Sequence, residues 1–441
     1  MQPSARLAAA IEILASIEVA IMARGLPADR LVADYFRARR FAGSKDKRAI
    51  SDMVYGVLRQ REVLLWALEE ATLSVDGRSL LIAYLCRHDA ESLGLFGGDD
   101  KFAPPAPSGV EESGITTLKS LNWATAPVEA RCNVPAWAAA GLHQRFGADF
   151  ETAMAAFHET APLDIRINAL KDVGLDIKSK LSIPLEAIEK NKYSSFGYRI
   201  HARVNLGADK SYRGGYIEVQ DEAAQVASAL VAAEPGHQVV DLCAGGGGKS
   251  LAVAADMANK GQIHAFDISG KRLADFRHRI QRAGVRNIQV TRLAPEGSGR
   301  KSALQDLVGR ADRVVVDVPC TGTGTWRRSP DQRWRFDETS LAEINKLQAT
   351  ILREAASLVK VRGRLVYMTC SLLPAENEQI IQGFMKQAAD GWKLLDYRDI
   401  WRAVLASAVP DTVSQEPKCL QFAPHSHGTD GFFVALLERQ A

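Results

Sequence analysis

The chain has 441 residues, of which 46% are hydrophobic and 24% charged, and its formal net charge is +3. This length exceeds one ordinary hydrophobic core and the composition excludes a disordered chain, so we expect two or three globular domains. Only a local cluster of basic residues would argue for a nucleic-acid partner, because the overall charge is small.

The first 95 residues show helical periodicity. One face of the segment 5–24 collects apolar residues at steps of three and four: Leu7, Ile11, Leu14, Ile17 and Ile21. Glu12 and Glu18 interrupt this segment, and each carboxylate would cost a few kcal/mol inside a bilayer. We therefore expect a soluble, cytoplasmic protein with no signal peptide and no membrane span.

Changes in composition and in hydrophobic periodicity along the chain predict three domains. A segment rich in Gly, Pro and acidic residues at 94–114 predicts a loop inside a helical domain of residues 1–145. Strand-like alternation in PLDIRINAL and SSFGYRIHARV predicts a small α+β domain at 146–235. The remainder, 236–441, is expected to form an α/β domain.

In this last domain, short apolar segments alternate with segments of helical length. The strand-like segments are HQVVDLC, QIHAFDIS, RNIQVTRL, DRVVVDVP and GRLVYMTC. Such alternation predicts a parallel sheet covered by helices on both faces. Two further segments, WKLLDYRDI and DGFFVALLER, predict two more strands at one edge.

The glycine-rich stretch CAGGGGKS, residues 243–250, follows the first of these strands. A phosphate-binding P-loop needs glycine five residues before Gly248, where the chain has Cys243. A dinucleotide motif starting at Gly245 needs glycine at position 250, where the chain has Ser250. Neither template fits, and what remains is a strand, a glycine turn and a helix.

Such a turn lets the backbone approach a ligand closely, and the following helix offers free N–H groups. Asp267, 19 residues after Gly248, is placed to accept hydrogen bonds from ribose hydroxyls. These features favour an adenosine-bearing cofactor without a pyrophosphate cradle, and S-adenosylmethionine is such a molecule. A nicotinamide or flavin, a nucleoside triphosphate, and a turn without ligand are the alternatives.

Two cysteines follow predicted central strands. Cys320 lies in DVPCTGTG and Cys370 in MTCSLLPAENE, at the rim where doubly wound folds bind ligands. A single buried cysteine usually only packs, but two at successive strand ends favour a reactive site. The six cysteines contain no CxxC pair and no histidine at zinc-binding spacing, so we expect neither a structural metal nor a disulfide framework.

From about residue 160 to its end, the chain resembles the RNA cytosine-C5 methyltransferases. The resemblance rests on QDEAAQ, DLCAGGGGKS, FDIS, DVPCTGTGTWRRSPD, YMTCSLLPAENE and PHSHGTDGFFVALLER. Through DKRAISDMVYGVLR, the first 145 residues resemble the NusB-like RNA-binding domain of bacterial 16S rRNA methyltransferases of the RsmB (Fmu) type. The resemblance implies a Rossmann-like methyltransferase domain with a mostly parallel seven-stranded sheet, an all-α NusB-like domain, and a small α+β RNA-binding subdomain between them.

The implied reaction is methyl transfer from S-adenosylmethionine to C5 of a cytosine in RNA, above all in 16S rRNA or a small-subunit assembly intermediate. C5 of cytosine is a poor nucleophile, and a thiolate that adds to C6 makes C5 reactive. The resemblance gives the attacking thiolate to Cys370 and gives Cys320 the task of releasing the covalent adduct. We expect Asp317 to hydrogen-bond the pyrimidine edge and Lys249 to face the same pocket, where its charge would favour a thiolate. A lysine at the helix start that points to solvent is the alternative for Lys249.

The resemblance also implies the set of residues that holds the cofactor: Cys243, Ala244, Gly245, Gly246, Gly247, Gly248, Lys249, Asp267 and Asp317. Two positions depart from the family pattern. Gly246 stands where proline is usual, and Leu293 and Ala294 stand where an aspartate after the third strand usually contacts adenine. Glu296 is the nearest acidic substitute.

Two basic segments are candidate RNA contacts. Residues 37–48 contain six basic residues and one acid, and residues 326–335 interleave four arginines with two tryptophans. A solvated charged surface is the alternative for both. Two other functions stay open: a non-catalytic NusB-like RNA-binding or ribosome-assembly factor with a degenerate cofactor fold, and a nicotinamide-dependent oxidoreductase.

Overall fold

The computed structural model describes residues 1–441 except 172–180, 182, 203, 389–390 and 441. The chain divides into two compact units. The first, here called the helical unit, comprises residues 1–160 and 325–340, and the second, the α/β unit, comprises residues 161–324 and 341–441. The domain boundaries inferred above, 1–145, 146–235 and 236–441, stay a prediction.

The helical unit is built from α-helices joined by short 3-10 turns. Its elements are α1 (Pro3–Met22), α2 (Ala28–Ala38), α3 (Ser44–Leu58), α4 (Arg61–Glu70), α5 (Gly77–His88), η1 (Ala90–Leu95), α6 (Gly109–Ser120), η2 (Trp123–Thr125), α7 (Val128–Arg131), α8 (Ala136–Phe146), η3 (Gly147–Asp149), α9 (Phe150–Ala155) and η7 (Pro330–Trp334). On α1, the expected apolar face is confirmed, since Leu7, Leu14, Ile17 and Ile21 are buried. No helix in the described part of the chain is long and apolar enough to cross a membrane.

Residues 325–340 complete the core of the helical unit although they are distant in sequence. Trp326 and Arg333 are fully buried, and Arg327 is 5% exposed. The indole of Trp137 donates to the Arg333 carbonyl at 2.8 Å. The expectation that the tryptophans and arginines of 326–335 face RNA is therefore wrong for these three side chains, which are held inside the fold.

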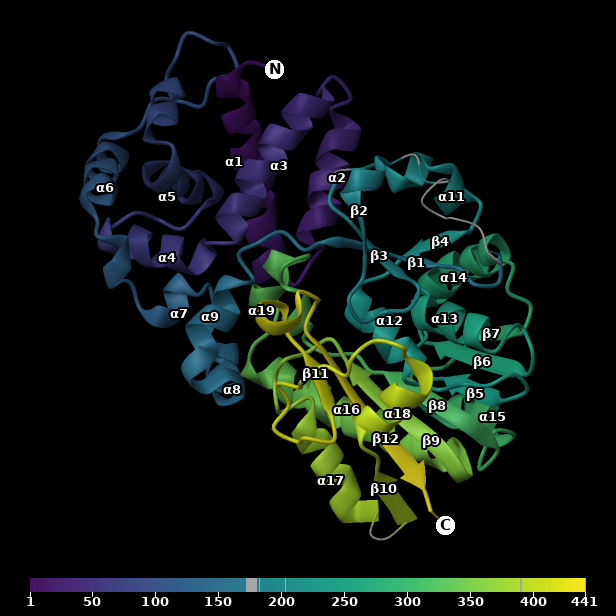
Figure 1. The fold of residues 1–441 in the computed structure, drawn as a ribbon. Helices are drawn as coiled ribbons and strands as arrows, with labels where there is room; N and C mark the ends of the chain where they lie inside the picture. Colours follow the sequence, from purple (N-terminus) through teal and green to yellow (C-terminus); the bar gives the residue numbers. More distant parts are fainter. Residues whose placement is uncertain (172–180, 182, 203, 389–390, 441) are drawn as a thin grey trace. The chain divides into compact units, whose positions relative to one another are not determined.

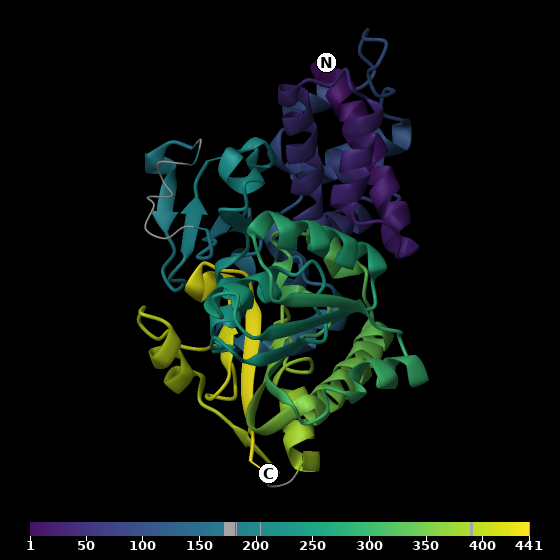
Figure 2. The same cartoon turned by 90° about the vertical axis from the view of Figure 1, so that its right-hand side faces the viewer.

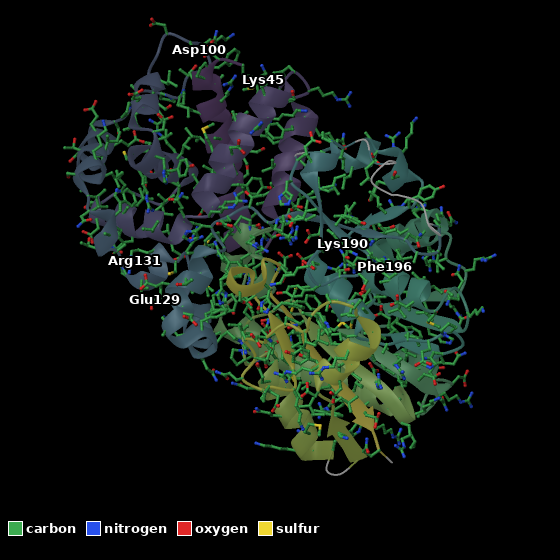
Figure 3. All side chains as sticks on the ribbon, viewed as in Figure 1. Lys45, Asp100, Glu129, Arg131, Lys190 and Phe196 are labelled. Carbon is green, nitrogen blue, oxygen red and sulfur yellow. The ribbon has the colours of Figure 1, made fainter. Side chains whose placement is uncertain are left out.

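The other basic segment, 37–48, joins α2 to α3. Arg39 pairs with Glu12 at 2.7 Å and stacks over the Tyr35 ring at 3.9 Å. Lys45, at the start of α3, is exposed (Figure 3). Part of this segment therefore has a structural role, and RNA contact by the remainder stays a prediction.

The α/β unit contains two sheets (Figure 1). Its strands are β1 (Leu163–Ile167), β2 (Ile188–Lys190), β3 (Gly197–Ile200), β4 (Ile217–Val219), β5 (Gln238–Asp241), β6 (Gln262–Asp267), β7 (Ile288–Arg292), β8 (Ala311–Asp317), β9 (Val359–Thr369), β10 (Trp392–Leu394), β11 (Leu420–Phe422) and β12 (Phe432–Arg439). Its helical elements are η4 (Leu185–Ala187), η5 (Leu206–Ala208), α11 (Lys210–Arg213), α12 (Glu222–Ala229), α13 (Gly248–Asp256), α14 (Gly270–Ala283), α15 (Ser298–Gln305), η6 (Thr323–Thr325), α16 (Glu338–Leu358), α17 (Glu378–Ala388), α18 (Tyr397–Val404) and α19 (Pro424–His427).

The large sheet has the strand order β10-β12-β9-β8-β5-β6-β7. The five strands from β9 to β7 pair in parallel, whereas β12 is antiparallel to β9 and to β10. This confirms the expected Rossmann-like sheet and the two added strands at one edge. The short strand β11, which the sequence did not indicate, pairs with β12 as an eighth strand.

Alternating side chains of the central strands pack into separate cores on the two faces of this sheet. Val315 and Val366 belong to the core that includes residues of α12, α13 and α14. Val314, Val316 and Leu365 belong to the core that includes residues of α15, α16 and α17. Helices therefore cover both faces (Figure 2), and this explains the continuous apolar character of these strands.

The small sheet is antiparallel, with the order β2-β3-β1-β4. Asp164 of β1 is fully enclosed and accepts two hydrogen bonds from the Arg199 guanidinium of β3, at 2.8 and 3.1 Å. The same carboxylate accepts from the backbone N–H of Glu222 at 3.2 Å, at the start of α12. A buried ion pair thus connects the small sheet to the first helix of the larger fold.

Candidate active site

The glycine turn between β5 and α13 is held at both ends by Asp241. This carboxylate accepts from the Cys243 backbone N–H at 3.3 Å and from the Ser250 hydroxyl at 2.5 Å. Burial raises the pKa of Asp241 to about 6, because a charged carboxylate is poorly solvated there. Sequence reasoning did not select Asp241, although its place at the end of β5, before the glycines, was the available signal.

Asp267 closes the turn from the neighbouring strand β6. Its two carboxylate oxygens accept from the backbone N–H of Gly245 at 2.9 Å and of Ser269 at 2.7 Å. An ionised carboxylate has about four acceptor positions, so two remain for further donors. The side chain is therefore fixed in orientation and still able to bind hydroxyl groups.

The end of β7 carries no carboxylate in the position usual for the family. Leu293 is 1% exposed, packs in the core and donates its backbone N–H to the Asp267 carbonyl at 3.0 Å. Ala294 and Glu296 follow on an exposed turn. The aspartate that is missing from the sequence after the third strand is therefore not replaced by Leu293 or Ala294 in the structure.

Gly247 lies where the glycine turn contacts α14. Its φ is +79°, in the left-handed region, and a Cβ atom added there would lie 1.9 Å from Cδ2 of the buried Phe276 ring. Glycine is required here both for backbone conformation and for close packing. Gly248 has no such constraint, since its nearest neighbours to an added Cβ are 3.7 Å away.

Replacing Gly247 by alanine is therefore expected to lower the free energy of unfolding by about 2–4 kcal/mol, since left-handed backbone and forced overpacking each cost about 1–3 kcal/mol. Urea unfolding followed by circular dichroism measures this loss. Gly248→Ala is the matched control and should stay close to the parent protein. Equal stability of the two variants would contradict the proposed clash with Phe276.

Lys249 and Asp317 form an ion pair between α13 and the end of β8. Nζ of Lys249 lies 2.5 Å from a carboxylate oxygen of Asp317, and 4.9 Å from the centroid of the Phe432 ring. Burial opposes the lysine charge, but the Asp317 carboxylate outweighs it and raises the pKa of Lys249. Lys249 also lies within electrostatic range of Cys370. The lysine is thus a fixed cation at the rim of the sheet.

Cys320 and Cys370 meet at the same rim. Their sulfur atoms are 3.3 Å apart, within hydrogen-bonding distance for sulfur, and come from the ends of β8 and β9. The hydrogen bond to Cys370, followed by burial, raises the pKa of the Cys320 thiol well above its ordinary value. Cys320 is consequently a protonated thiol beside Cys370 over the physiological pH range.

Glu376 joins the two cysteine loops to each other. The side chain is fully buried and accepts from the Thr321 backbone N–H at 2.9 Å, the Thr321 hydroxyl at 2.5 Å and the Gln348 amide at 3.0 Å. The Ser371 hydroxyl donates to it as well. Burial raises the pKa of Glu376 despite these donors. Its place within LLPAENE was part of the motif, but only the fold shows that it contacts both loops.

We expect Glu376→Gln to lower the free energy of unfolding by about 1–3 kcal/mol, because an amide nitrogen cannot accept from buried hydroxyl donors. Looser loops should also expose the two sulfurs, so alkylation of Cys320 and Cys370 by iodoacetamide should become several times faster. Mass spectrometry measures the alkylation rate at each cysteine. Glu296→Gln, at an exposed position, is the control, and unchanged rates in Glu376→Gln would contradict the bridging role.

The structure thus brings Lys249, Asp317, Cys320 and Cys370 together at one rim, as the sequence motifs suggested. Cys243 differs from the other two cysteines of the motifs, since it packs against the core and burial strongly raises its thiol pKa. Only its backbone contributes to the glycine turn. Among the described residues, no group of three or more His, Cys, Asp or Glu side chains is placed to hold a metal ion.

Comparison with known proteins relates the chain that carries this site to a family. The model of a family described as "16S rRNA methyltransferase RsmB/F" matches residues 228–438. A protein of Synechocystis sp. named probable ribosomal RNA small subunit methyltransferase B is 33% identical over 313 residues, which are 69% of this chain and 66% of that protein. The chain thus spans about two thirds of the length of this relative.

Two further similarities extend the match. The ribosomal RNA small subunit methyltransferase B of Citrobacter koseri is 26% identical over 417 residues, covering 89% of this chain and 91% of that protein. The crystal structure of a methyltransferase homolog from Pyrococcus horikoshii has a TM-score of 0.57 and 25% identity, covering 71% of this chain and 98% of that one. The chain therefore belongs to the RsmB/F family of 16S rRNA methyltransferases.

Proposed function

We propose that this protein transfers a methyl group from S-adenosylmethionine to C5 of a cytosine in RNA, with 16S rRNA as the substrate. The observation that carries the proposal is the pair of sulfurs, 3.3 Å apart, beside the ion pair of Lys249 and Asp317. Membership of the RsmB/F family supports ribosomal RNA as the acceptor. The pair of thiols supports C5 of cytosine as the methylated atom, because this ring carbon reacts only after a nucleophile has added to the ring.

The glycine turn fits the cofactor. At Gly245 and Gly248 an added Cβ would have no neighbour closer than 3.7 Å, so the backbone leaves room for a ligand there. Asp267 is oriented by two backbone donors and keeps acceptor capacity for ribose hydroxyls. When bound, S-adenosylmethionine supplies a methyl group on a sulfonium sulfur.

In this proposal the Cys370 thiolate adds to C6 of the cytosine and forms a C–S bond, which makes C5 nucleophilic. After methylation, a solvent water takes the C5 proton, and the electron pair of the C5–H bond restores the ring double bond and expels Cys370 as a thiolate. The raised pKa of Cys320 favours its protonated form, whose S–H can donate to the sulfur of Cys370, since either sulfur can be the donor at 3.3 Å. This hydrogen bond favours the thiolate before addition and stabilises it again on release.

Lys249 and Asp317 complete the electrostatics. The cation at Lys249, within range of Cys370, favours a negatively charged sulfur. Asp317 fixes the lysine and presents a carboxylate at the end of β8, where it can accept from the cytosine amino group. Both residues act through charge and hydrogen bonding, with no covalent role.

The test is incubation with methyl-labelled S-adenosylmethionine and 16S rRNA from cells lacking this protein, followed by bisulfite sequencing of the product. We expect one or a few cytosines to become resistant to bisulfite conversion. Incorporation of label at a base other than cytosine would overturn the proposed position of methylation.

A second candidate function is a non-catalytic RNA-binding factor with the same fold. The observation in its favour is Leu293, in the place where the family usually has an aspartate for adenine. Calorimetry with S-adenosylmethionine separates the two candidates. The methyltransferase must bind the cofactor, whereas a protein that binds rRNA but no cofactor would be the RNA-binding factor.

A further inference from the structure

A pocket lined by several arginines lies wholly within the helical unit, apart from the candidate active site. A pocket of about 180 Å³ opens between α3, α4, α5, α7 and the residues after α9. Its basic lining consists of Arg59, Arg87, Arg131 and His158. None of the described residues in its lining is acidic. The volume is several times the roughly 30 Å³ that a water molecule occupies, so a small polyatomic ion can enter.

The arginines of this pocket are poorly neutralised. Arg131, on α7, has a carboxylate partner, Glu151, at 3.3 Å. Arg59 and Arg87 have no carboxylate within ion-pair distance among the described residues, although Arg87 stacks over the ring of Trp123 at 4.9 Å. Nε of Arg59 is buried without a hydrogen-bond partner there. At least two cations therefore face the pocket without an ion-pair partner among the described residues, and Asp52 acts on Arg59 only at longer range.

Arg333 does not line the pocket, but it adds a third cation within electrostatic range of Arg59 and His158. Its side chain is fully buried, and none of its three guanidinium nitrogens has a hydrogen-bond partner in the described part of the chain. The guanidinium stacks on the Trp326 ring at 4.9 Å. Burial and then the charge of Arg59 lower the pKa of Arg333 to about 9, and the Glu62 carboxylate only partly offsets them.

His158 connects Arg333 to the pocket. It lines the pocket, and its Nε2 is buried without a hydrogen-bond partner among the described residues. Burial and then the charge of Arg333 lower the pKa of His158 to about 4. Uncompensated buried charge is costly, so a cluster of this kind is stabilised by a bound anion.

We propose that this pocket binds a phosphate group of the RNA backbone. A phosphate has oxygens in several directions and accepts from several arginines at once, and the planar guanidinium matches it well. Arg87 and Arg131 are exposed at the mouth while Arg59 is half-buried, so a phosphate that belongs to a polymer can reach the inner donors from outside. The choice of RNA as the source rests on the proposed function.

The experiment compares the full-length protein with Arg59→Gln/Arg87→Gln, which removes both charges and keeps polar side chains that can still donate hydrogen bonds. Arg24→Gln/Arg30→Gln is the matched control, because these exposed arginines of the same unit lie outside segment 37–48 and pair with Asp337 and Asp34. The first probe is inorganic phosphate at constant ionic strength, read as a shift in the thermal midpoint. The second is a 16S rRNA fragment, with affinity measured over a series of salt concentrations.

We expect phosphate to raise the midpoint of the parent and the control, but not of the pocket variant. The pocket variant should bind RNA about tenfold more weakly, with a salt slope lower by about 0.7 for each RNA phosphate that the variant no longer neutralises. Arg333→Met provides a second test, in which weaker RNA binding cannot be explained by a loss of folding stability. It should unfold at a higher temperature than the parent, since a buried unpaired charge is gone, and yet bind RNA more weakly.

Stabilisation by phosphate without any change in RNA affinity would assign the pocket to free phosphate and overturn the RNA proposal. Lack of stabilisation of the parent protein by phosphate would remove the site altogether. Methylation of the same RNA fragment is measured in parallel. Pocket-dependent RNA binding without methylation would refute the proposed function alone, and methylation with pocket-independent binding would refute this inference alone.

Discussion

Cys370→Ala should reduce methyl transfer to RNA by at least about a thousandfold, equivalent to about 4 kcal/mol of transition-state stabilisation. The physical reason is that C5 of cytosine stays unreactive unless a nucleophile adds to C6, and the alanine side chain provides none. The backbone of the loop should persist, because Glu376 holds it through Thr321 and Ser371. Incorporation of label from S-adenosylmethionine measures the loss.

Two controls make this result specific. Cofactor binding by Cys370→Ala, measured by calorimetry, should match the parent, since the glycine turn is formed by β5, β6 and α13. Cys419→Ala removes a fully buried thiol from the other core of the sheet and should retain methyl transfer. Activity that survives Cys370→Ala and disappears with Cys320→Ala would reverse the roles of the two sulfurs.

Cys320→Ala should instead trap the enzyme on its substrate. The Cys320 sulfur lies 3.3 Å from that of Cys370, so it is the group placed to stabilise the departing thiolate. Without it, addition to C6 and methylation still proceed, but elimination slows. We expect a covalent protein–RNA complex that survives denaturing gel electrophoresis and contains the transferred methyl label.

The double variant Cys320→Ala/Cys370→Ala is the control for this complex. It lacks the sulfur that forms the bond to C6, so no covalent species should form even after long incubation. Formation of the complex by the double variant would mean that another residue is bonded to RNA. Absence of the complex in Cys320→Ala, together with normal turnover, would remove Cys320 from the release step.

Much of the fold could be predicted from the sequence because its signals are local. The alternation of apolar strands with helical segments after Gly236 identifies the parallel sheet, and the register then places Cys320 and Cys370 at neighbouring strand ends. The short strand β11 was not predicted, since three residues carry too little periodicity to distinguish a strand from a loop.

The meaning of the basic segment 326–335 could not be predicted in this way. Arginines and tryptophans next to a catalytic motif resemble an RNA-binding surface, yet Trp326 and Arg333 are enclosed in the helical unit. Whether a charged side chain is exposed depends on residues more than a hundred positions away, such as Trp137. An exposed RNA-binding segment and a buried structural segment can therefore have the same local composition.

The sequence by itself determined which groups are available: two thiols and an aspartate at strand ends, a glycine turn before a helix, and a second acid one strand away. Only the tertiary structure decided their partners. It set the distance between Cys320 and Cys370, joined their loops through Glu376, and placed Arg333 within electrostatic range of Arg59. The physical reason is that strand ends follow from local periodicity, whereas burial and charge neutralisation depend on segments that meet only after folding.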